Sequence, residues 1–77
     1  IGNWFDIAIK KLDFYFGEPY YTKELKIPSQ YVNGFKFYLI ENPIFVTKLK
    51  NNDKAMMVFL MIELSIKYIE IIACEDK

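Results

Sequence analysis

The chain has 77 residues and a net charge of zero, with ten lysines, no arginine and no histidine. This length allows one small domain, over residues 1–77, and leaves no room for a catalytic domain with a second module. Without histidine the chain lacks the commonest general base and metal ligand, and without net charge no overall field attracts nucleic acid or an acidic membrane.

The first predicted element is a helix over residues 4–16. Asn3 is a candidate N-cap, with the acidic Asp6 three residues later. Gly17 suits a left-handed cap after the last turn, and Pro19 prevents the helix from continuing. The apolar residues that recur at helical spacing are Trp4, Phe5, Ile9, Leu12 and Phe16.

Residues 18–50 have the pattern of three antiparallel strands joined by turns. Residues 20–27 are rich in aromatic and β-compatible side chains and predict the first strand. Asn42-Pro43 indicates a turn, and residues 44–50 after it predict the third strand.

The middle strand follows the strongest hairpin signal in the chain, Asn33-Gly34, because a type I′ turn needs positive φ at both central positions. In this register Pro28 lies opposite Leu39 and has no N–H to donate, so the first strand bends, bulges or ends there and lies at an edge. The residues after the turn alternate as in a half-buried strand, with Phe35, Phe37 and Leu39 on one face and Lys36 and Tyr38 on the other.

The last predicted element is a helix over residues 55–73. Its N-terminal half is apolar all round, whereas Glu63, Lys67 and Glu70 in the second half fall within about 60° of one another. A strand over residues 63–68 is the competing interpretation, but its alternation fails over residues 69–72. About 19 such residues would also be long enough to span a bilayer. The three charges of Glu63, Lys67 and Glu70 on one stripe indicate a solvent-exposed helix face instead, so we expect no membrane span.

These elements predict an α+β fold in the order helix, strand, strand, strand, helix. The three-stranded antiparallel meander is expected to pack one face on the two helices. The expected core is Phe5, Ile9, Leu12, Phe37, Leu39, Val58, Phe59, Ile62 and Ile66.

The chain is rich in apolar residues, at 53%, and in aromatic residues, at 18%. A domain of this size buries only about 60% of the surface that its unfolded chain exposes, so either the core is unusually aromatic or some apolar surface faces a partner. Because tyrosine is enriched at protein interfaces, Tyr20, Tyr21 and Tyr31 are candidate partner-binding residues, with ordinary packing on the sheet as the alternative.

Catalysis has little support in the sequence. Ser29, Ser65 and Cys74 have no histidine to activate them, and the isolated glycines form no phosphate-binding loop. Glu63 and Glu70 are spaced like paired carboxylates, but Lys67 between them indicates a ladder of ion pairs instead. We therefore predict that the chain is not an enzyme and binds neither metal nor cofactor.

The lysines around the last predicted turn support a second hypothesis. Lys48, Lys50 and Lys54 are candidate anion-binding residues, and the order of elements resembles double-stranded-RNA-binding domains. That resemblance implies phosphate contacts from lysines at the start of the second helix. Only Lys54 matches that position here, since Asn52 and Asp53 take places where the family has basic residues.

The leading hypothesis is a non-enzymatic protein-binding module: a small regulator, an inhibitor or immunity-type protein, or a minor subunit. Its partner is another protein or a second copy of the chain, and the alternative is the nucleic-acid-binding domain described above. Lysine without arginine, with many phenylalanine, tyrosine, isoleucine and asparagine residues, indicates an AT-rich genome, viral or low-GC bacterial. The single cysteine fits a reducing compartment, so we expect a cytoplasmic protein.

Overall fold

The first helix, α1, covers Trp4–Tyr15 in the computed structural model, which describes residues 3–75. The predicted cap is confirmed, because the Asp6 N–H donates a hydrogen bond to Asn3 Oδ1 at 3.0 Å. The helix ends at Phe16, whose backbone is extended and whose N–H donates to the Leu12 carbonyl at 2.8 Å. The left-handed cap predicted at Gly17 is wrong, since no glycine in the described range has a positive φ.

The predicted meander is also wrong, because residues 3–75 contain helices and turns and no strand. The chain is helical rather than α+β. After α1 come a π-helical turn over Tyr20–Glu24 (η1) and a 3₁₀ turn over Ser29–Tyr31 (η2). They lead into two short helices, α2 over Val32–Ile40 and α3 over Pro43–Lys50.

Helix α2 replaces the predicted hairpin and middle strand. Val32, Phe35 and Leu39 are spaced three and four residues apart, and all three are buried on one helical face. Phe37 shares the strand face with Phe35 and Leu39 but not the helix face, and its side chain is 45% exposed. The burial pattern therefore follows the helical period and not the alternation of a strand.

Asn33-Gly34 lies inside α2 and forms no turn. The glycine there serves helix packing, because a Cβ on Gly34 would collide with the hydroxyl of Tyr68 on the last helix. A glycine in a helix lowers stability by about 1 kcal/mol relative to alanine, but it permits the two helices to approach closely at this point.

Helix α3 begins at the Asn42-Pro43 pair that was interpreted as a turn between strands. Asn42 is the N-cap, since its Oδ1 accepts a hydrogen bond from the Phe45 N–H at 3.0 Å, and Pro43 is the first helical residue. Phe45 and Leu49, four residues apart, are both buried. The pair thus begins a helix whose apolar face points into the core.

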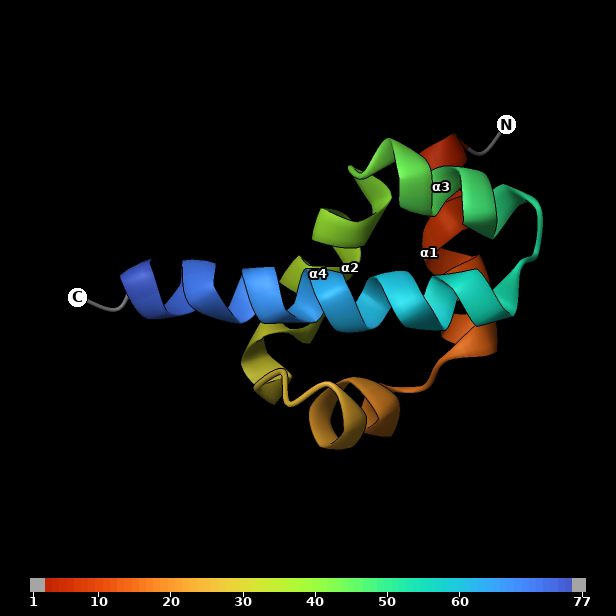
Figure 1. The fold of residues 1–77 in the computed structure, drawn as a ribbon. Coiled ribbons are helices and arrows are strands. Elements are labelled where there is room, and N and C mark those ends of the chain that lie inside the picture. The colour runs from red at the N-terminus through yellow and green to blue at the C-terminus, as the bar shows by residue number, and fades with distance from the viewer. Residues whose placement is uncertain (1–2, 76–77) are drawn as a thin grey trace.

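The long helix α4 covers Lys54–Glu75 and confirms the last predicted element. Asp53 caps it, because its Oδ1 accepts from the Met56 N–H at 3.3 Å. Before it, Asn52 has a φ of 56°, and its Oδ1 accepts from the Tyr15 hydroxyl at 2.8 Å, which ties the end of α1 to the α3–α4 turn. Helices α2 and α3 pack against α4, α1 packs on α2 and α3, and the C-terminal end of α4 extends beyond them (Figure 1).

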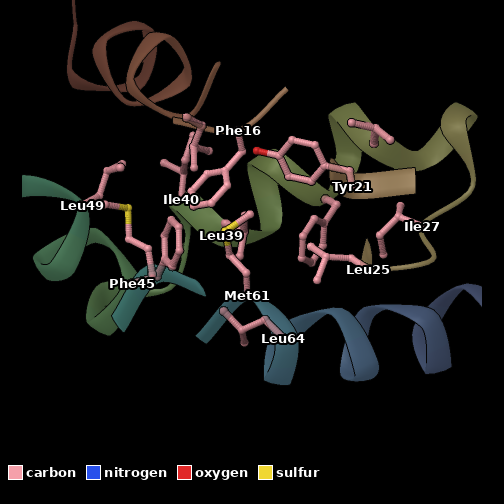
Figure 2. Close-up of a cluster of buried hydrophobic side chains, with 14 of the residues drawn as sticks. Phe16, Tyr21, Leu25, Ile27, Leu39, Ile40, Phe45, Leu49, Met61 and Leu64 are labelled. Atoms are coloured by element: carbon pink, nitrogen blue, oxygen red, sulfur yellow. The ribbon is translucent and has the colours of Figure 1, made fainter. Parts of the chain in front are cut away.

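The core lies between α4 and the shorter helices (Figure 2), and most of the core list predicted from the sequence is wrong. Leu12 and Leu39 are buried, and Ile9 and Val58 pack at the edge of the core. Five predicted core residues are instead exposed: Phe5, Phe37, Phe59, Ile62 and Ile66. The largest side chains that fill the centre, with less than 2% exposure, are Leu12, Tyr21, Ile27, Phe35, Leu39, Phe45, Leu49, Met57 and Met61.

Candidate protein-binding surface

The three tyrosines predicted to bind a partner do not form one surface. Tyr21 is fully buried and belongs to the core (Figure 2), and Tyr20 is half-buried with its ring centroid 4.9 Å from that of Phe16. Tyr31 is half-buried on η2 and packs against the core. Most of the aromatic surface of these three tyrosines is therefore buried against the core.

Burial also sets the chemistry of the two neighbouring tyrosines. Desolvation raises the pKa of Tyr21 above its ordinary value of 10.0, and the charges of Asp13 and Tyr20 raise it further. The pKa of Tyr20 is raised for the same first reason, with the Glu24 carboxylate adding to it. Both phenols stay neutral at physiological pH, so neither supplies an anionic group.

Two of the three lysines of the alternative hypothesis lie over aromatic rings. Lys50 Nζ lies 4.8 Å from the centroid of the Trp4 ring, and Lys54 Nζ lies 5.6 Å from that of Phe16. Trp4 and Phe16 stand at opposite ends of α1, about 18 Å apart at 1.5 Å per residue. Lys48 is half-buried on α3. The structure thus places two of these cations over aromatic rings at opposite ends of α1.

The surface that stands out is an apolar stripe along α4. Phe59 is 54% exposed, Ile62 47%, Ile66 57% and Ile69 36%. Ala55 and Ala73, one turn before and one turn after these four, are exposed as well. We call these six residues the α4 stripe.

The α4 stripe and the buried face of α4 are two different sides of one helix. At 100° per residue the stripe spans about 80°, and its centre lies about 130° from the centre of the buried face. The buried face carries Met57, Met61, Leu64, Ser65 and Ile72. Helix α4 therefore has one apolar side for the core and a second that the chain itself leaves uncovered.

Polar residues border the stripe on one flank. Glu63, Lys67 and Glu70 lie beside it and are exposed, and together they leave only one net negative charge. The residues on the other flank, Val58, Ser65 and Ile72, turn toward the core. An apolar strip with a charged rim has the anatomy of a contact surface between proteins.

Two hollows on the surface are secondary to this stripe. One hollow, of about 420 Å³, lies between α1 and α2. The Phe5 and Phe37 rings, 4.9 Å apart, line it together with Lys10 and Lys36. The other, of about 460 Å³, lies beside the C-terminal half of α4 and includes Ile71. Neither hollow has a histidine to act as a base, since the chain contains none.

Sequence reasoning missed the stripe for an identifiable reason. The spacing from Ala55 to Ala73 is four, three, four, three and four residues, which averages 3.6 and is the period of one face of an α-helix. Phe59, Ile62 and Ile66 were instead assigned to the core, because the burial of an apolar helix face is the default expectation. The spacing is visible in the sequence, but which of two apolar faces the chain covers is not.

Within residues 3–75, no helix is long and apolar enough to cross a membrane. The same residues contain no group of three histidine, cysteine, aspartate or glutamate side chains placed to hold a metal ion.

No protein-family model, curated protein or solved structure matches the chain. Its function therefore has to follow from its own residues and their geometry.

Proposed function

We propose that the chain is a non-enzymatic protein-binding module and that the α4 stripe is its contact surface. One observation carries this proposal: four large apolar side chains stand in a row on one helix and are 36–57% exposed. A small regulator, an inhibitor and a minor subunit of an assembly all act through a surface of this kind.

The energetics support a binding role for the stripe. Fully burying a side chain of this size contributes about 1.5–3 kcal/mol, and each of the four is about half exposed. Covering the stripe therefore contributes several kcal/mol that folding of the single chain leaves unused. Isolated apolar residues on a surface need no explanation, but a continuous row of them does.

The stripe is better placed for this role than the other exposed apolar residues. Phe14, Ile44 and Ile7 lie on α1 and α3, which present no continuous row. Phe5 and Phe37 contact each other across the hollow between α1 and α2, so each covers part of the other. Only α4 carries five of these exposed large side chains, and four of them share one face.

The test is a pull-down from the cells that express the chain, using the wild type and two variants. Ile66→Glu places a charge at the centre of the stripe, whereas Ile71→Glu makes the same change at another exposed position of the same helix. We expect the wild type and Ile71→Glu to retain the same proteins, including the chain itself, and Ile66→Glu to lose them.

Circular dichroism controls for folding, because both positions are exposed and neither variant should lose helix. Equal retention by all three proteins would show that the stripe is not the contact surface. Selective loss with Ile71→Glu would place the contact at the hollow that includes this residue.

A further inference from the structure

We propose that the hollow between α1 and α2 binds a small aromatic monocarboxylate. We call it the α1–α2 hollow, and its lining residues are Phe5, Asp6, Ile9, Lys10, Asn33, Lys36 and Phe37. It shares no residue with the α4 stripe, so this inference is independent of the proposed function.

The size and lining of the α1–α2 hollow suit a small molecule. Its volume of about 420 Å³ lies within the range of about 300–1,000 Å³ that small-molecule sites occupy. Such sites combine an apolar wall with a few polar groups that fix the orientation of the ligand. The α1–α2 hollow has both, because phenylalanine and isoleucine side chains line it together with two lysines, an asparagine and an aspartate.

Two phenylalanine rings form most of the apolar wall. Phe5 is 40% exposed and Phe37 is 45% exposed, and their ring planes are tilted by 52° at a centroid distance of 4.9 Å. A third ring placed against such a tilted pair can stack on one ring and meet the other edge to face, the two arrangements that aromatic pairs prefer. An aromatic ligand therefore covers ring surface that folding leaves exposed, and it gains more than an aliphatic ligand of equal area.

The lysines lie toward one end of the α1–α2 hollow. The contact of Phe5 with Phe37 marks one end, and the ion pair of Lys36 with Asp13 marks the other. Phe5 and Asp13 are eight residues apart on α1, which is about 12 Å at 1.5 Å per residue. Lys10 lies between them and is closer to Asp13. A ligand whose ring packs on the two phenylalanines therefore directs its other end toward the two lysines.

Both lysines have hydrogen-bond donors left for a carboxylate. Lys36 Nζ lies 2.7 Å from Asp13 Oδ1, and this bond uses one of its three donors. The Lys36 side chain is only 14% exposed, so its position is fixed before a ligand arrives. Lys10 is exposed and forms no ion pair with any other of residues 3–75. Asn33 adds an amide donor from α2, so the donors come from both helices that enclose the ligand.

The arrangement of charge favours an acid over an amine. Asp6 follows Phe5 directly, so it lies at the ring end of the α1–α2 hollow. At the other end an amine would meet the ammonium groups of Lys10 and Lys36, and the acid nearest to them, Asp13, is already paired. A carboxylate at that end meets donors of opposite charge instead.

The first experiment titrates the whole chain with hydrocinnamate, a phenyl ring on a propionate chain, and follows the backbone amides by heteronuclear NMR. We expect saturable shifts over residues 5–10 and 33–37, with a dissociation constant of about 1 mM or below. The alcohol and the amine with the same ring and chain, and propionate without the ring, should each bind at least about tenfold more weakly.

Three results of this titration would overturn the inference. The first is the absence of saturable shifts with hydrocinnamate up to about 20 mM. The second is saturable shifts that lie only outside the two segments. The third is equal binding of the alcohol, the amine or propionate, because the site would then select neither the charge nor the ring.

The second experiment repeats the titration with two matched pairs of variants. Lys10→Gln removes the unpaired cation, and Lys23→Gln makes the same change at an exposed lysine outside the α1–α2 hollow. Phe37→Ala removes one ring of the wall, and Phe14→Ala removes a ring that is 85% exposed elsewhere on α1. We expect Lys10→Gln and Phe37→Ala to raise the dissociation constant for hydrocinnamate at least about fivefold, and the two control variants to leave it unchanged.

All four positions are exposed, so circular dichroism should show four folded proteins. Equal binding by Lys10→Gln and Lys23→Gln would refute recognition of the carboxylate by Lys10. Equal binding by Phe37→Ala and Phe14→Ala would refute recognition of the ring between α1 and α2.

Discussion

Tyr21 is the residue whose environment departs most from what its side chain requires. Its hydroxyl is buried and has no hydrogen-bond partner, although buried tyrosines usually find one. The ring lies in the centre of the core (Figure 2), with Phe35 at 6.1 Å between centroids and Lys36 Nζ 5.6 Å from its own centroid. Lys36 is in turn held by Asp13, 2.7 Å from its Nζ. The aromatic body of Tyr21 thus stabilises the fold, whereas its hydroxyl contributes a desolvation cost.

The raised pKa of Tyr21 predicts a loss of stability at high pH. In the unfolded chain this phenol ionises near pH 10, whereas burial in the folded chain keeps it protonated well above that. The unfolded state therefore binds fewer protons above pH 10, and the free energy of unfolding falls by up to about 1.4 kcal/mol per pH unit from this group. The measurement is urea unfolding at pH 7, 10 and 11.

Tyr21→Phe is the control for this prediction, since it keeps the ring and removes the ionisable group. At pH 7 we expect it to unfold at the same urea concentration as the wild type or higher, because the hydroxyl makes no hydrogen bond. Above pH 10 the variant should lose less stability than the wild type. Parallel losses in the two proteins would mean that the other tyrosines and the lysines cause the whole effect.

At the scale of elements, Gly34 decides how closely α2 and α4 approach. A Cβ at this position would collide with the Tyr68 hydroxyl, whereas Tyr68 Cζ at 3.6 Å is in ordinary contact distance. The Tyr68 ring cannot move away easily, because its centroid lies 5.3 Å from those of both Phe35 and Tyr38. The clash of a Cβ added at position 34 therefore comes from this single oxygen.

This geometry predicts a coupling between two substitutions. Gly34→Ala should lower the free energy of unfolding by about 1–2 kcal/mol, because overpacking outweighs the helix propensity of alanine. In a Tyr68→Phe background the same substitution should raise it by up to about 1 kcal/mol, because the clashing oxygen is gone and propensity dominates. Urea unfolding of the four proteins gives the coupling energy. An equal effect of Gly34→Ala in both backgrounds would contradict the predicted clash.

The sequence was informative about α1 and α4 and misleading about α2 and α3. The first and last helices of the chain have caps and several turns of periodic apolar residues, so the helical period is unambiguous there. Over α2, Phe35 and Leu39 satisfy both the helical and the strand spacing, and only the exposure of Phe37 separates the two. Asn42-Pro43 is a common pair both in turns and at the start of a helix. Only the packing against α4 separates these alternatives.

The candidate surface could be predicted only in part. The high apolar content raised the question of uncovered apolar surface. The enrichment of tyrosine at interfaces then led to Tyr20, Tyr21 and Tyr31 as the binding residues, but these three pack mainly in or against the core. The helical spacing of Phe59, Ile62, Ile66 and Ile69 along α4 is the signal that would have located the stripe. Whether a protein partner binds there stays a prediction, as do the AT-rich source and the cytoplasmic location.

At the scale of the whole molecule, the shape is uneven. The described residues extend 40 Å in the longest direction and 22 Å in the shortest, and a helix of 22 residues such as α4 is about 33 Å long. Its C-terminal end therefore projects beyond the other helices (Figure 1), and among residues 69–74 only Ile72 is buried. A helix end with so few tertiary contacts is held mainly by its own hydrogen bonds, which open locally and often.

A partner on the α4 stripe would cover part of this projecting end, which gives a prediction about hydrogen exchange. Ile69 belongs to the stripe, so the amides of residues 70–74 should exchange more slowly with a captured partner bound than in the free chain. The amide of Ile7, which donates to the Asn3 carbonyl at 3.4 Å in the first turn of α1, opens locally away from the stripe and should not respond to the partner. Ile66→Glu should abolish the response of residues 70–74, whereas Ile71→Glu should preserve it. A bound partner that leaves these amides unchanged would mean that it contacts a different face.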